Sequence, residues 1–267
     1  MKKNGTFLLM DSIEFSGWLT DFKANRVIKI IQNHHTYQPD HKGFNGKNHF
    51  TLLQGMENYH VKNCGYAAIA QNLTTFPDGM IAVCRNLNMI PAGIKGANQT
   101  GICIEHLGNF DSGKDIMTPE HHETILMLNA LLCRKFNLIP DKNSVVYHHW
   151  YDLKTGKRTN GSGITKSCPG TAFFGGNTTE SAELNFYPLI TQKLTNLNNY
   201  TPAPIPLFTV EITANKLNVR AGAGIEFKIL RSLNRGIIIP VYKTEGVWYC
   251  IHPTEKEFIH SKYVCNQ

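Results

Sequence analysis

A proline-alternating stretch near the C-terminal end constrains the fold of this chain more than any other feature. Residues 201–206 have the sequence TPAPIP, with a proline at every second position. Each proline fixes its own φ and lacks an amide donor, so neither a helix nor a central strand continues through such a segment. Pro-rich segments are extended, semi-rigid spacers. We therefore expect two domains, residues 1–199 and 208–267, joined by a linker at residues 200–207.

The longer N-terminal part contains both helical and strand-like patterns. We expect helices at residues 12–22, 49–60, 118–136 and 181–194, and strands at residues 28–31, 65–73, 80–84, 101–105 and 145–147. The helix that starts at Thr118 has the clearest signal, because a capping hydroxyl is followed by Pro119 and Glu120. On the helix at 49–60, the spacing of Leu52, Met56 and Tyr59 predicts a stripe that packs in the core.

The pattern changes after the linker. Short apolar runs separated by Gly-containing turns predict five or six strands within about 60 residues. Such a pattern is typical of a small all-β barrel.

Charge and composition limit the possible partners. The 267 residues are 42% hydrophobic and 18% charged, which indicates a globular chain, and the formal net charge is +7. A basic balance suits an anionic partner such as nucleic acid, anionic lipid or a phosphate-rich cell wall, although a solvated basic surface is the better explanation. No run of Lys and Arg is long enough to indicate nucleic acid, so we expect no nucleic-acid partner. The oligomeric state stays open.

The N-terminal residues do not have the pattern of a signal peptide. The apolar run Phe7–Met10 has about four residues where a signal peptide needs roughly 7–15. No window approaches the roughly 20 apolar residues of a membrane span. We expect no membrane insertion, synthesis in the cytoplasm without a signal peptide, and action after release.

Cysteine and histidine placement indicates a metal site. The seven cysteines show no Cys-x-x-Cys spacing, so most of them are expected to be buried thiols. Two adjacent pairs, His34-His35 and His148-His149, each follow a strand-like run, and Cys168 precedes Pro169-Gly170. One histidine from each pair plus Cys168 would suit a tetrahedral zinc with its fourth position open, as in catalytic sites.

Four segments give residues 27–177 a resemblance to a known family. They are residues 31–36 (IQNHHT), 78–81 (DGMI), 98–108 (NQTGICIEHLG) and 166–170 (KSCPG). In this order they resemble the type-2 N-acetylmuramoyl-L-alanine amidases, a zinc family that includes phage lysozyme-amidases, anhydromuropeptide amidases and peptidoglycan recognition proteins. The resemblance implies an α/β fold with a mixed sheet flanked by helices.

The resemblance also implies the metal ligands. The family's first ligand follows the apolar strand and falls on His34. The second falls on His148, with His149 as the alternative, and the third, directly before Pro-Gly, is Cys168. The gap between His148 and Cys168 is longer than usual in the family, so residues 154–163 must loop out and return.

The remaining site residues follow from the anhydromuropeptide type. Its general base lies seven residues after an Asn, which places the base at Glu105 and makes Asn98 a candidate substrate contact. Lys166, two residues before the third ligand, would stabilise the oxyanion. Phage-type members have a tyrosine at the position of Gln71, so this chain departs from them, and Tyr66 is expected to be structural.

The implied reaction is hydrolysis of the amide between N-acetylmuramic acid and L-alanine of the stem peptide, as in an endolysin or autolysin. Two other classes stay open. One is a peptidoglycan-binding protein that has lost the chemistry. The other is a thiol peptidase built on Cys168 and a histidine, and sensitivity to a chelator would separate it from a zinc amidase.

The C-terminal domain resembles a bacterial SH3-like module. Residues 214–224 (ANKLNVRAGAG), 246–249 (GVWY) and 258–264 (FIHSKYV) carry this resemblance. Modules of this kind bind peptidoglycan peptides, so we expect both domains to contact bacterial peptidoglycan.

Overall fold

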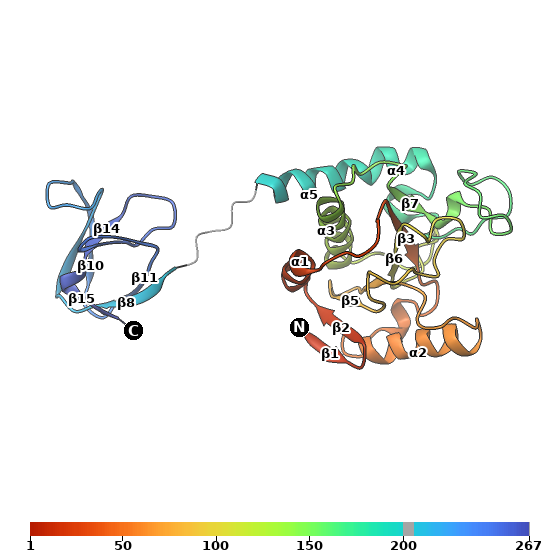
Figure 1. Ribbon diagram of the computed structural model, residues 1–267, viewed down its shortest axis with the longest axis horizontal. Coiled ribbons are helices and arrows are strands. Elements are labelled where there is room, and N and C mark those ends of the chain that lie inside the picture. The colour runs from red at the N-terminus through yellow and green to blue at the C-terminus, as the bar shows by residue number, and fades with distance from the viewer. Residues whose placement is uncertain (200–205, 267) are drawn as a thin grey trace. The chain divides into compact units, whose positions relative to one another are not determined.

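The computed structural model describes residues 1–199 and 206–266, which form two compact units. The first unit is Met1–Asn199 and the second is Tyr200–Gln267 (Figure 1). The linker expected at residues 200–207 falls largely on residues 200–205, which lie outside the described residues. Each unit has a hydrophobic core of its own.

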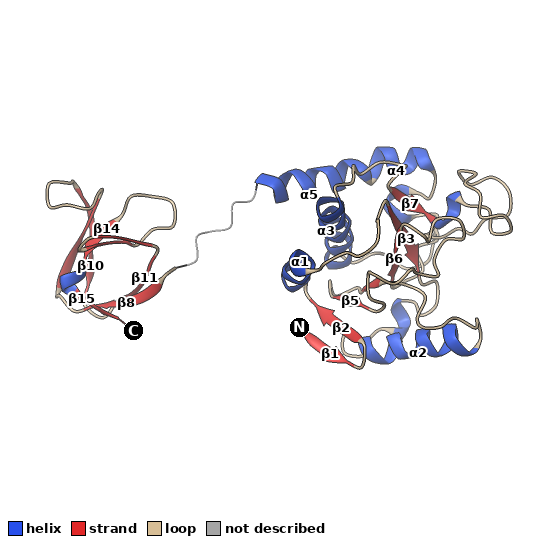
Figure 2. Ribbon diagram, viewed as in Figure 1, coloured by secondary structure: helices blue, strands red, loops and turns tan. Residues whose placement is uncertain are grey.

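A seven-stranded mixed sheet forms the centre of the first unit (Figure 2). Its strand order is β1-β2-β5-β4-β6-β3-β7. Strand β3 runs parallel to β6 and β7, and β4 runs parallel to β6, whereas the pairs β1–β2, β2–β5 and β4–β5 are antiparallel. The strands are β1 (Lys2–Asn4), β2 (Phe7–Met10), β3 (Ile30–His35), β4 (Leu73–Thr75), β5 (Ile81–Val83), β6 (Gly101–His106) and β7 (Val145–Tyr147). The mixed sheet that the sequence predicted is confirmed.

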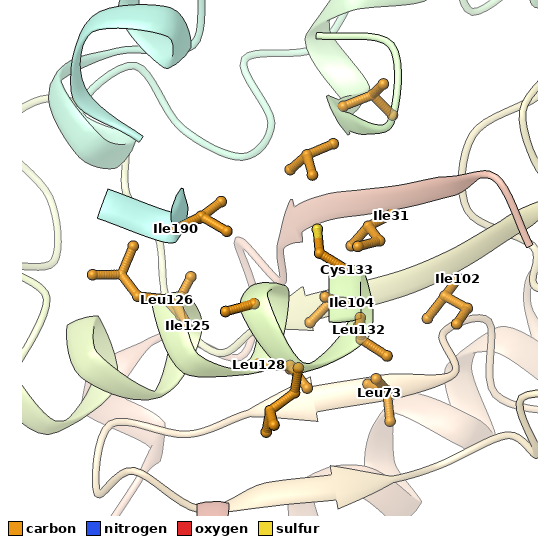
Figure 3. Packing of buried hydrophobic residues seen from close by; sticks show 14 of the residues in the cluster. Ile31, Leu73, Ile102, Ile104, Ile125, Leu126, Leu128, Leu132, Cys133 and Ile190 are labelled. Carbon is orange, nitrogen blue, oxygen red and sulfur yellow. The ribbon is translucent and has the colours of Figure 1, made fainter. Parts of the chain in front are cut away.

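Successive side chains of a strand point to opposite faces of the sheet, and here both faces carry apolar side chains. Helices therefore cover both faces. On one face, Ile31 of β3 and Ile102 and Ile104 of β6 pack in the core that α1, α3 and α5 complete (Figure 3). On the other face, residues of β2 and β5 pack against Leu53 and Met56 of α2. The helices are α1 (Ser12–Asp21), α2 (His49–Lys62), α3 (Pro119–Phe136), α4 (Thr179–Asn185) and α5 (Tyr187–Asn199).

Helix α3 begins where the sequence predicted. The hydroxyl of Thr118 accepts a hydrogen bond from the backbone amide of His121 at 3.1 Å, and Pro119 occupies the first turn. The helix ends at Phe136, and the next residue, Asn137, adopts the left-handed conformation (φ 54°) that commonly terminates helices.

The strand predicted at residues 65–73 is wrong except for Leu73, the first residue of β4. The preceding carbonyl groups bind a side chain instead of a neighbouring strand. The guanidinium group of Arg85 donates to the carbonyls of Ala68, Ile69 and Ile90 at 2.7–3.0 Å. These hydrogen bonds hold Ala68 and Ile69 in an irregular segment that precedes β4.

The single helix predicted at residues 181–194 is two helices. Helix α4 starts after a cap at Thr178, and α5 starts at Tyr187. Pro188 lies in the first turn of α5, where its missing amide hydrogen leaves no intrahelical bond unmade, so it favours a new helix start over a continuous helix. The sequence also failed to predict β1 and β2, which extend the sheet beyond β5. Strand β2 is apolar, whereas β1 consists of the exposed residues Lys2, Lys3 and Asn4.

The second unit is all β, as predicted, but its described residues form eight strands where the sequence predicted five or six. Its strands form two antiparallel sheets, ordered β10-β9-β14-β13-β12 and β11-β8-β15, around a core of Val210, Ile212, Leu217, Val219, Val241, Ile251 and Ile259. The strands are β8 (Phe208–Ile212), β9 (Lys216–Arg220), β10 (Ile229–Asn234), β11 (Ile238–Val241), β12 (Lys243–Glu245), β13 (Trp248–Cys250), β14 (Phe258–His260) and β15 (Val264–Asn266). Across the described parts of both units, no helix combines the length and the apolar character needed to cross a membrane.

Candidate metal centre and active site

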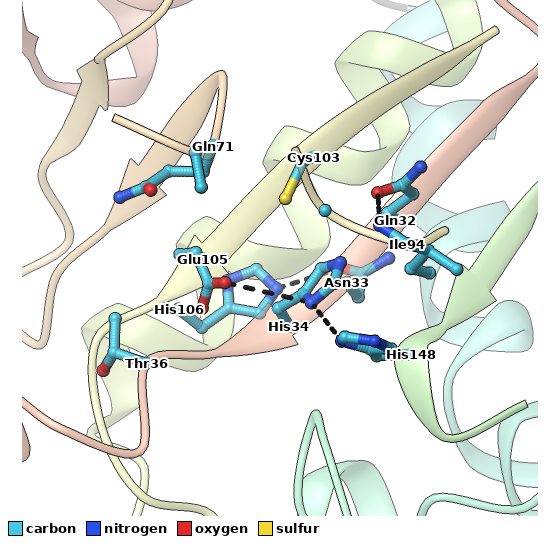
Figure 4. A network of polar contacts seen from close by, with 12 residues as sticks. Gln32, Asn33, His34, Thr36, Gln71, Ile94, Cys103, Glu105, His106 and His148 are labelled. Atoms are coloured by element: carbon cyan, nitrogen blue, oxygen red, sulfur yellow. Dashed lines mark hydrogen bonds and ion pairs between the residues drawn. The ribbon is translucent and has the colours of Figure 1, made fainter. Parts of the chain in front are cut away.

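Three parallel strands bring the candidate site residues to one edge of the sheet. In the register of β3 and β6, His34 lies opposite Glu105. Strand β7 pairs with the other side of β3 and ends at Tyr147, so His148 follows next to His34. Alternation along β3 and β6 turns His34 and Glu105 away from the isoleucine core, toward the α2 face of the sheet. Figure 4 shows their side chains on this face, with His148 beside His34.

His34, His148 and Cys168 form a buried cluster of potential metal ligands. One ligand atom from each residue lies within 4.8 Å of the others. The Nδ1 atoms of His34 and His148 face each other at 3.1 Å. Both rings are buried, and His34 is only 2% exposed.

Of the second histidine pair, His148 and not His149 faces this cluster. The ring of His149 contacts the carbonyl oxygen of Lys166 through Nδ1 at 2.7 Å and lies near the hydroxyl of Thr165. Its backbone amide donates to the carbonyl of Cys168 at 2.8 Å. His149 therefore holds the segment that carries Cys168.

The loop that carries Cys168 is fixed by close backbone packing. Gly170 adopts φ +122°, and a Cβ atom there would lie 2.4 Å from the carbonyl of Phe110, so only glycine fits. The side chain of Asn177 donates to the carbonyl of Ser167 at 2.7 Å. These contacts hold Cys168 against the ends of β3 and β7.

The charge states of the cluster suit a soft divalent cation. Burial, together with neighbouring His148, lowers the pKa of His34 well below its usual value, and burial lowers the pKa of His148 to about 4. Both imidazoles are therefore neutral and offer lone pairs at pH 7. Zinc–nitrogen bonds of about 2.0–2.1 Å in a tetrahedron place two nitrogens about 3.3 Å apart, close to the observed separation of the two rings. The donor set of two imidazoles and one thiolate fits zinc.

Glu105 is the carboxylate beside this cluster. Its Oε1 lies 3.8 Å from Nδ1 of His34, and its side chain is 19% exposed. Its Oε2 is buried and has no hydrogen-bond partner among the described residues. Burial raises the pKa of Glu105 to about 8, although Lys166 acts in the opposite direction.

A cleft of about 1190 Å³ opens over the cluster. Its lining includes the five residues His34, Glu105, His148, Lys166 and Cys168. Lys166 is exposed, so its ammonium group is accessible to a bound molecule. The cleft has the size of a site for a substrate larger than a single sugar or amino acid.

Aromatic side chains that the sequence did not assign to the site also line this cleft. Tyr59 of α2 is among them and is 58% exposed, so its predicted place in the core is wrong. Helix α2 buries His49, Leu53 and Met56 instead, a stripe at i, i+4 and i+7. The sequence contained this alternative helical stripe, but periodicity alone does not choose between two overlapping stripes. Tyr66, expected to be structural, also lines the cleft and is 39% exposed.

Asn98 and Gln71 lie behind the site. The Oδ1 of Asn98 accepts hydrogen bonds from the side chain of Gln32 and the backbone amide of Gly93, and Asn98 is not part of the cleft lining. Its contact with substrate stays a prediction. Gln71 is fully buried and donates to the hydroxyl of Thr74 at 3.0 Å.

The segment at residues 154–163 loops out and returns, as the spacing required. The carboxylate of Asp152 accepts hydrogen bonds from the backbone amides of Thr155 and Ile164, which closes the loop at its base. The loop touches the cleft edge, where Lys95 donates to the carbonyl of Lys154 at 2.7 Å.

The fold and the cluster together define a class of protein: a helix-covered mixed sheet with a His-His-Cys group and a half-buried carboxylate in an open cleft. Family models identify it further. Residues 24–171 match the model of the N-acetylmuramoyl-L-alanine amidase family, and residues 215–264 match the bacterial SH3 domain. The first match covers more than half of the chain, so the chain belongs to the N-acetylmuramoyl-L-alanine amidase family. Such a chain is a peptidoglycan amidase or a peptidoglycan-binding protein.

Solved structures with a similar fold include the following two. Drosophila PGRP-LB is 17% identical, with a TM-score of 0.46 over 61% of this chain and 83% of that chain. The endolysin amidase LysCS of Clostridium intestinale is 22% identical, with a TM-score of 0.44 over 64% of this chain and 86% of that chain. No curated protein has a significantly similar sequence.

Proposed function

We propose that this chain is a zinc-dependent amidase that cleaves the bond between N-acetylmuramic acid and L-alanine of the peptidoglycan stem peptide. The observation that carries the proposal is the buried cluster of His34, His148 and Cys168 beside Glu105, whose Oε2 has no hydrogen-bond partner among the described residues, all facing one cleft. Three protein ligands would leave a fourth position of zinc free for water, as in catalytic rather than structural zinc sites.

The roles of the protein groups follow from their placement. When bound, zinc supplies Lewis acidity that lowers the pKa of water to about 7. Glu105 accepts a proton from the attacking water and returns it to the leaving nitrogen, because its carboxylate lies beside the cluster and faces the cleft. Lys166 donates to the carbonyl oxygen as negative charge develops there.

A thiol-peptidase mechanism is disfavoured by the surroundings of Cys168. Burial raises the pKa of this thiol well above its usual value. Nucleophilic cysteines have lowered pKa values, usually beside a cation or a helix N-terminus. Metal binding, in contrast, removes the thiol proton directly.

The second unit is proposed to bind peptidoglycan as well. A tethered binding module raises the local concentration of the amidase on an insoluble polymer. We therefore propose that the protein acts as an endolysin or autolysin at the bacterial wall after release from the cytoplasm.

Digestion of purified peptidoglycan tests the proposal. The assay measures new alanine amino ends and new reducing sugar ends, with chelator and with zinc added back. We expect alanine ends that disappear with chelator and return with zinc. Reducing ends would show a glycosidase, chelator-resistant peptide cleavage would indicate the thiol peptidase, and wall binding without cleavage would indicate a recognition protein.

A further inference from the structure

A second group of potential metal ligands lies next to the first and shares one residue with it. His34, Cys103 and Glu105 each offer a ligand atom within 4.8 Å of the other two. We propose that this group forms a second position for a soft divalent cation such as zinc or cadmium, and that an ion bound there inhibits hydrolysis. The inhibitory part rests on the proposed function, whereas the binding part does not.

The register of the sheet produces this second group. Cys103 and Glu105 are two residues apart on β6, so their side chains point to the same face. On the parallel neighbour β3, Gln32 lies opposite Cys103 and His34 lies opposite Glu105. Figure 4 shows Cys103 and Glu105 side by side on one strand, with His34 next to them on the other.

Buried atoms without hydrogen-bond partners indicate that this second group lacks a ligand. The structure describes six buried side-chain nitrogen or oxygen atoms without a hydrogen-bond partner, and two of them are His34 Nε2 and Glu105 Oε2. Cys103 is a free thiol with no exposed surface. A buried polar atom without a partner has lost its hydration and gained no replacement, so a ligand that binds these atoms stabilises the folded protein.

The donor chemistry selects the kind of ion. A thiol, an imidazole and a carboxylate together favour zinc or cadmium over magnesium or calcium, which prefer oxygen ligands alone. This group has a carboxylate where the first cluster has a second imidazole. Nδ1 of His34 faces His148 in the first cluster, so the second ion would bind Nε2 of the same ring, and the ring N–H proton would pass to solvent. We therefore expect the second position to fill only after the first.

An ion at this position would bind Glu105, the proposed general base. A carboxylate held by a cation no longer accepts a proton from the attacking water. General-base catalysis contributes about 10²–10⁴-fold, so saturation of the second position should slow hydrolysis by about a hundredfold or more. Activity should rise with the first equivalent of zinc and fall at higher zinc.

The test counts ions on the full-length protein. In every sample the exposed Cys64 and Cys265 are replaced by serine, so that only buried thiols remain. The metal-free protein is titrated with cadmium, bound ions are counted by equilibrium dialysis, and thiolate–cadmium absorption is recorded. The comparison is between this background, Cys103→Ser, and Cys84→Ser as a control for loss of another buried thiol.

We expect two cadmium ions per chain for the background and the Cys84→Ser control, and one ion for Cys103→Ser with a smaller absorption change. Cys103→Ser should also lose the inhibition at excess zinc. If serine prevents folding, Cys103→Val keeps the site apolar and serves the same comparison. Equal ion counts with and without Cys103 would overturn the proposal.

The ion count also separates this proposal from the proposed function. If the protein cleaves no amide at any zinc level, the amidase proposal fails, yet the count still decides whether the second position exists. If the amide is cleaved and excess zinc inhibits Cys103→Ser as strongly as the unsubstituted protein, the inhibitory position is disproved while the amidase proposal stands.

Discussion

A substitution at Glu105 should slow catalysis strongly without removing the bound zinc. Its carboxylate faces the cleft but lies outside the His-His-Cys cluster. Glu105→Gln keeps the shape of the side chain and removes the base. We expect kcat to fall by about 10²–10⁴-fold while the first equivalent of zinc stays bound. Release of alanine amino ends and zinc content measure the two effects.

The control for this substitution is Asp111, another carboxylate that is not part of the His34, His148 and Cys168 cluster. Asp111 accepts hydrogen bonds from the hydroxyl of Ser167 and the amide of Thr171, on either side of the Cys168 loop. Asp111→Asn should change activity less than Glu105→Gln. A Glu105→Gln variant that keeps full activity would disprove the role of Glu105 as base.

The pKa of Glu105 also predicts how the stability of the metal-free protein depends on pH. Burial raises this pKa to about 8, from about 4.3 in the unfolded chain. Between these values the unfolded state loses the proton while the folded state keeps it, so stability falls as pH rises from about 5 to 8.

Glu105→Gln removes this dependence. In the metal-free state, the free energy of unfolding of the variant should exceed that of the unsubstituted protein by a few kcal/mol at pH 8, with little difference at pH 4. Urea unfolding at both pH values measures it. A difference that is the same at both values would contradict the assigned burial of the carboxyl group.

At the level of elements, the cap of α3 ties the helix to the turn between β4 and β5. The hydroxyl of Thr118 accepts from the amide of His121 and donates to the carbonyl of Pro77. Thr118→Ala should lower the free energy of unfolding by about 1–2 kcal/mol, because a helix cap and a link to the turn are lost together. The midpoint of urea unfolding measures the loss.

Thr195→Ala is a matched control for this substitution. Thr195 lies on the exposed side of α5, and its hydroxyl bonds only to the carbonyl of Thr191 within the same helix. Its removal should change stability by less than about 0.5 kcal/mol. Equal losses for Thr118→Ala and Thr195→Ala would show that the cap contributes nothing specific.

For the whole molecule, two separate cores predict two separable activities. The first unit buries its own cores and contains every proposed catalytic residue, and the second has a core of its own. A fragment of residues 1–199 should cleave soluble peptidoglycan fragments at nearly the full rate. It should sediment less with intact walls and digest them more slowly, because the tether is lost.

The complementary fragment makes this prediction sharper. Residues 206–267 alone should sediment with walls and release no alanine ends. If the first unit alone binds walls as strongly as the full chain does, the second unit has another role.

The sequence by itself determined the class of fold, most of the elements and the candidate cluster. Capping residues predicted α3 almost to the residue because such signals are local. The order of the motifs predicted that His34, His148 and Cys168 belong together, which the structure brings within 4.8 Å. Their role as zinc ligands stays a prediction.

Only the tertiary structure decided which side chains share a surface. Spacing did not choose between His148 and His149, whereas the pairing of β7 with β3 turns His148 toward His34. Periodicity placed Tyr59 in the core, but the packing of Leu53 turned it to the cleft. The sequence did not place Cys103 near His34, and only the register of β6 against β3 brings the two side chains together. Each outcome depends on contacts between segments far apart in the sequence, which no local pattern contains.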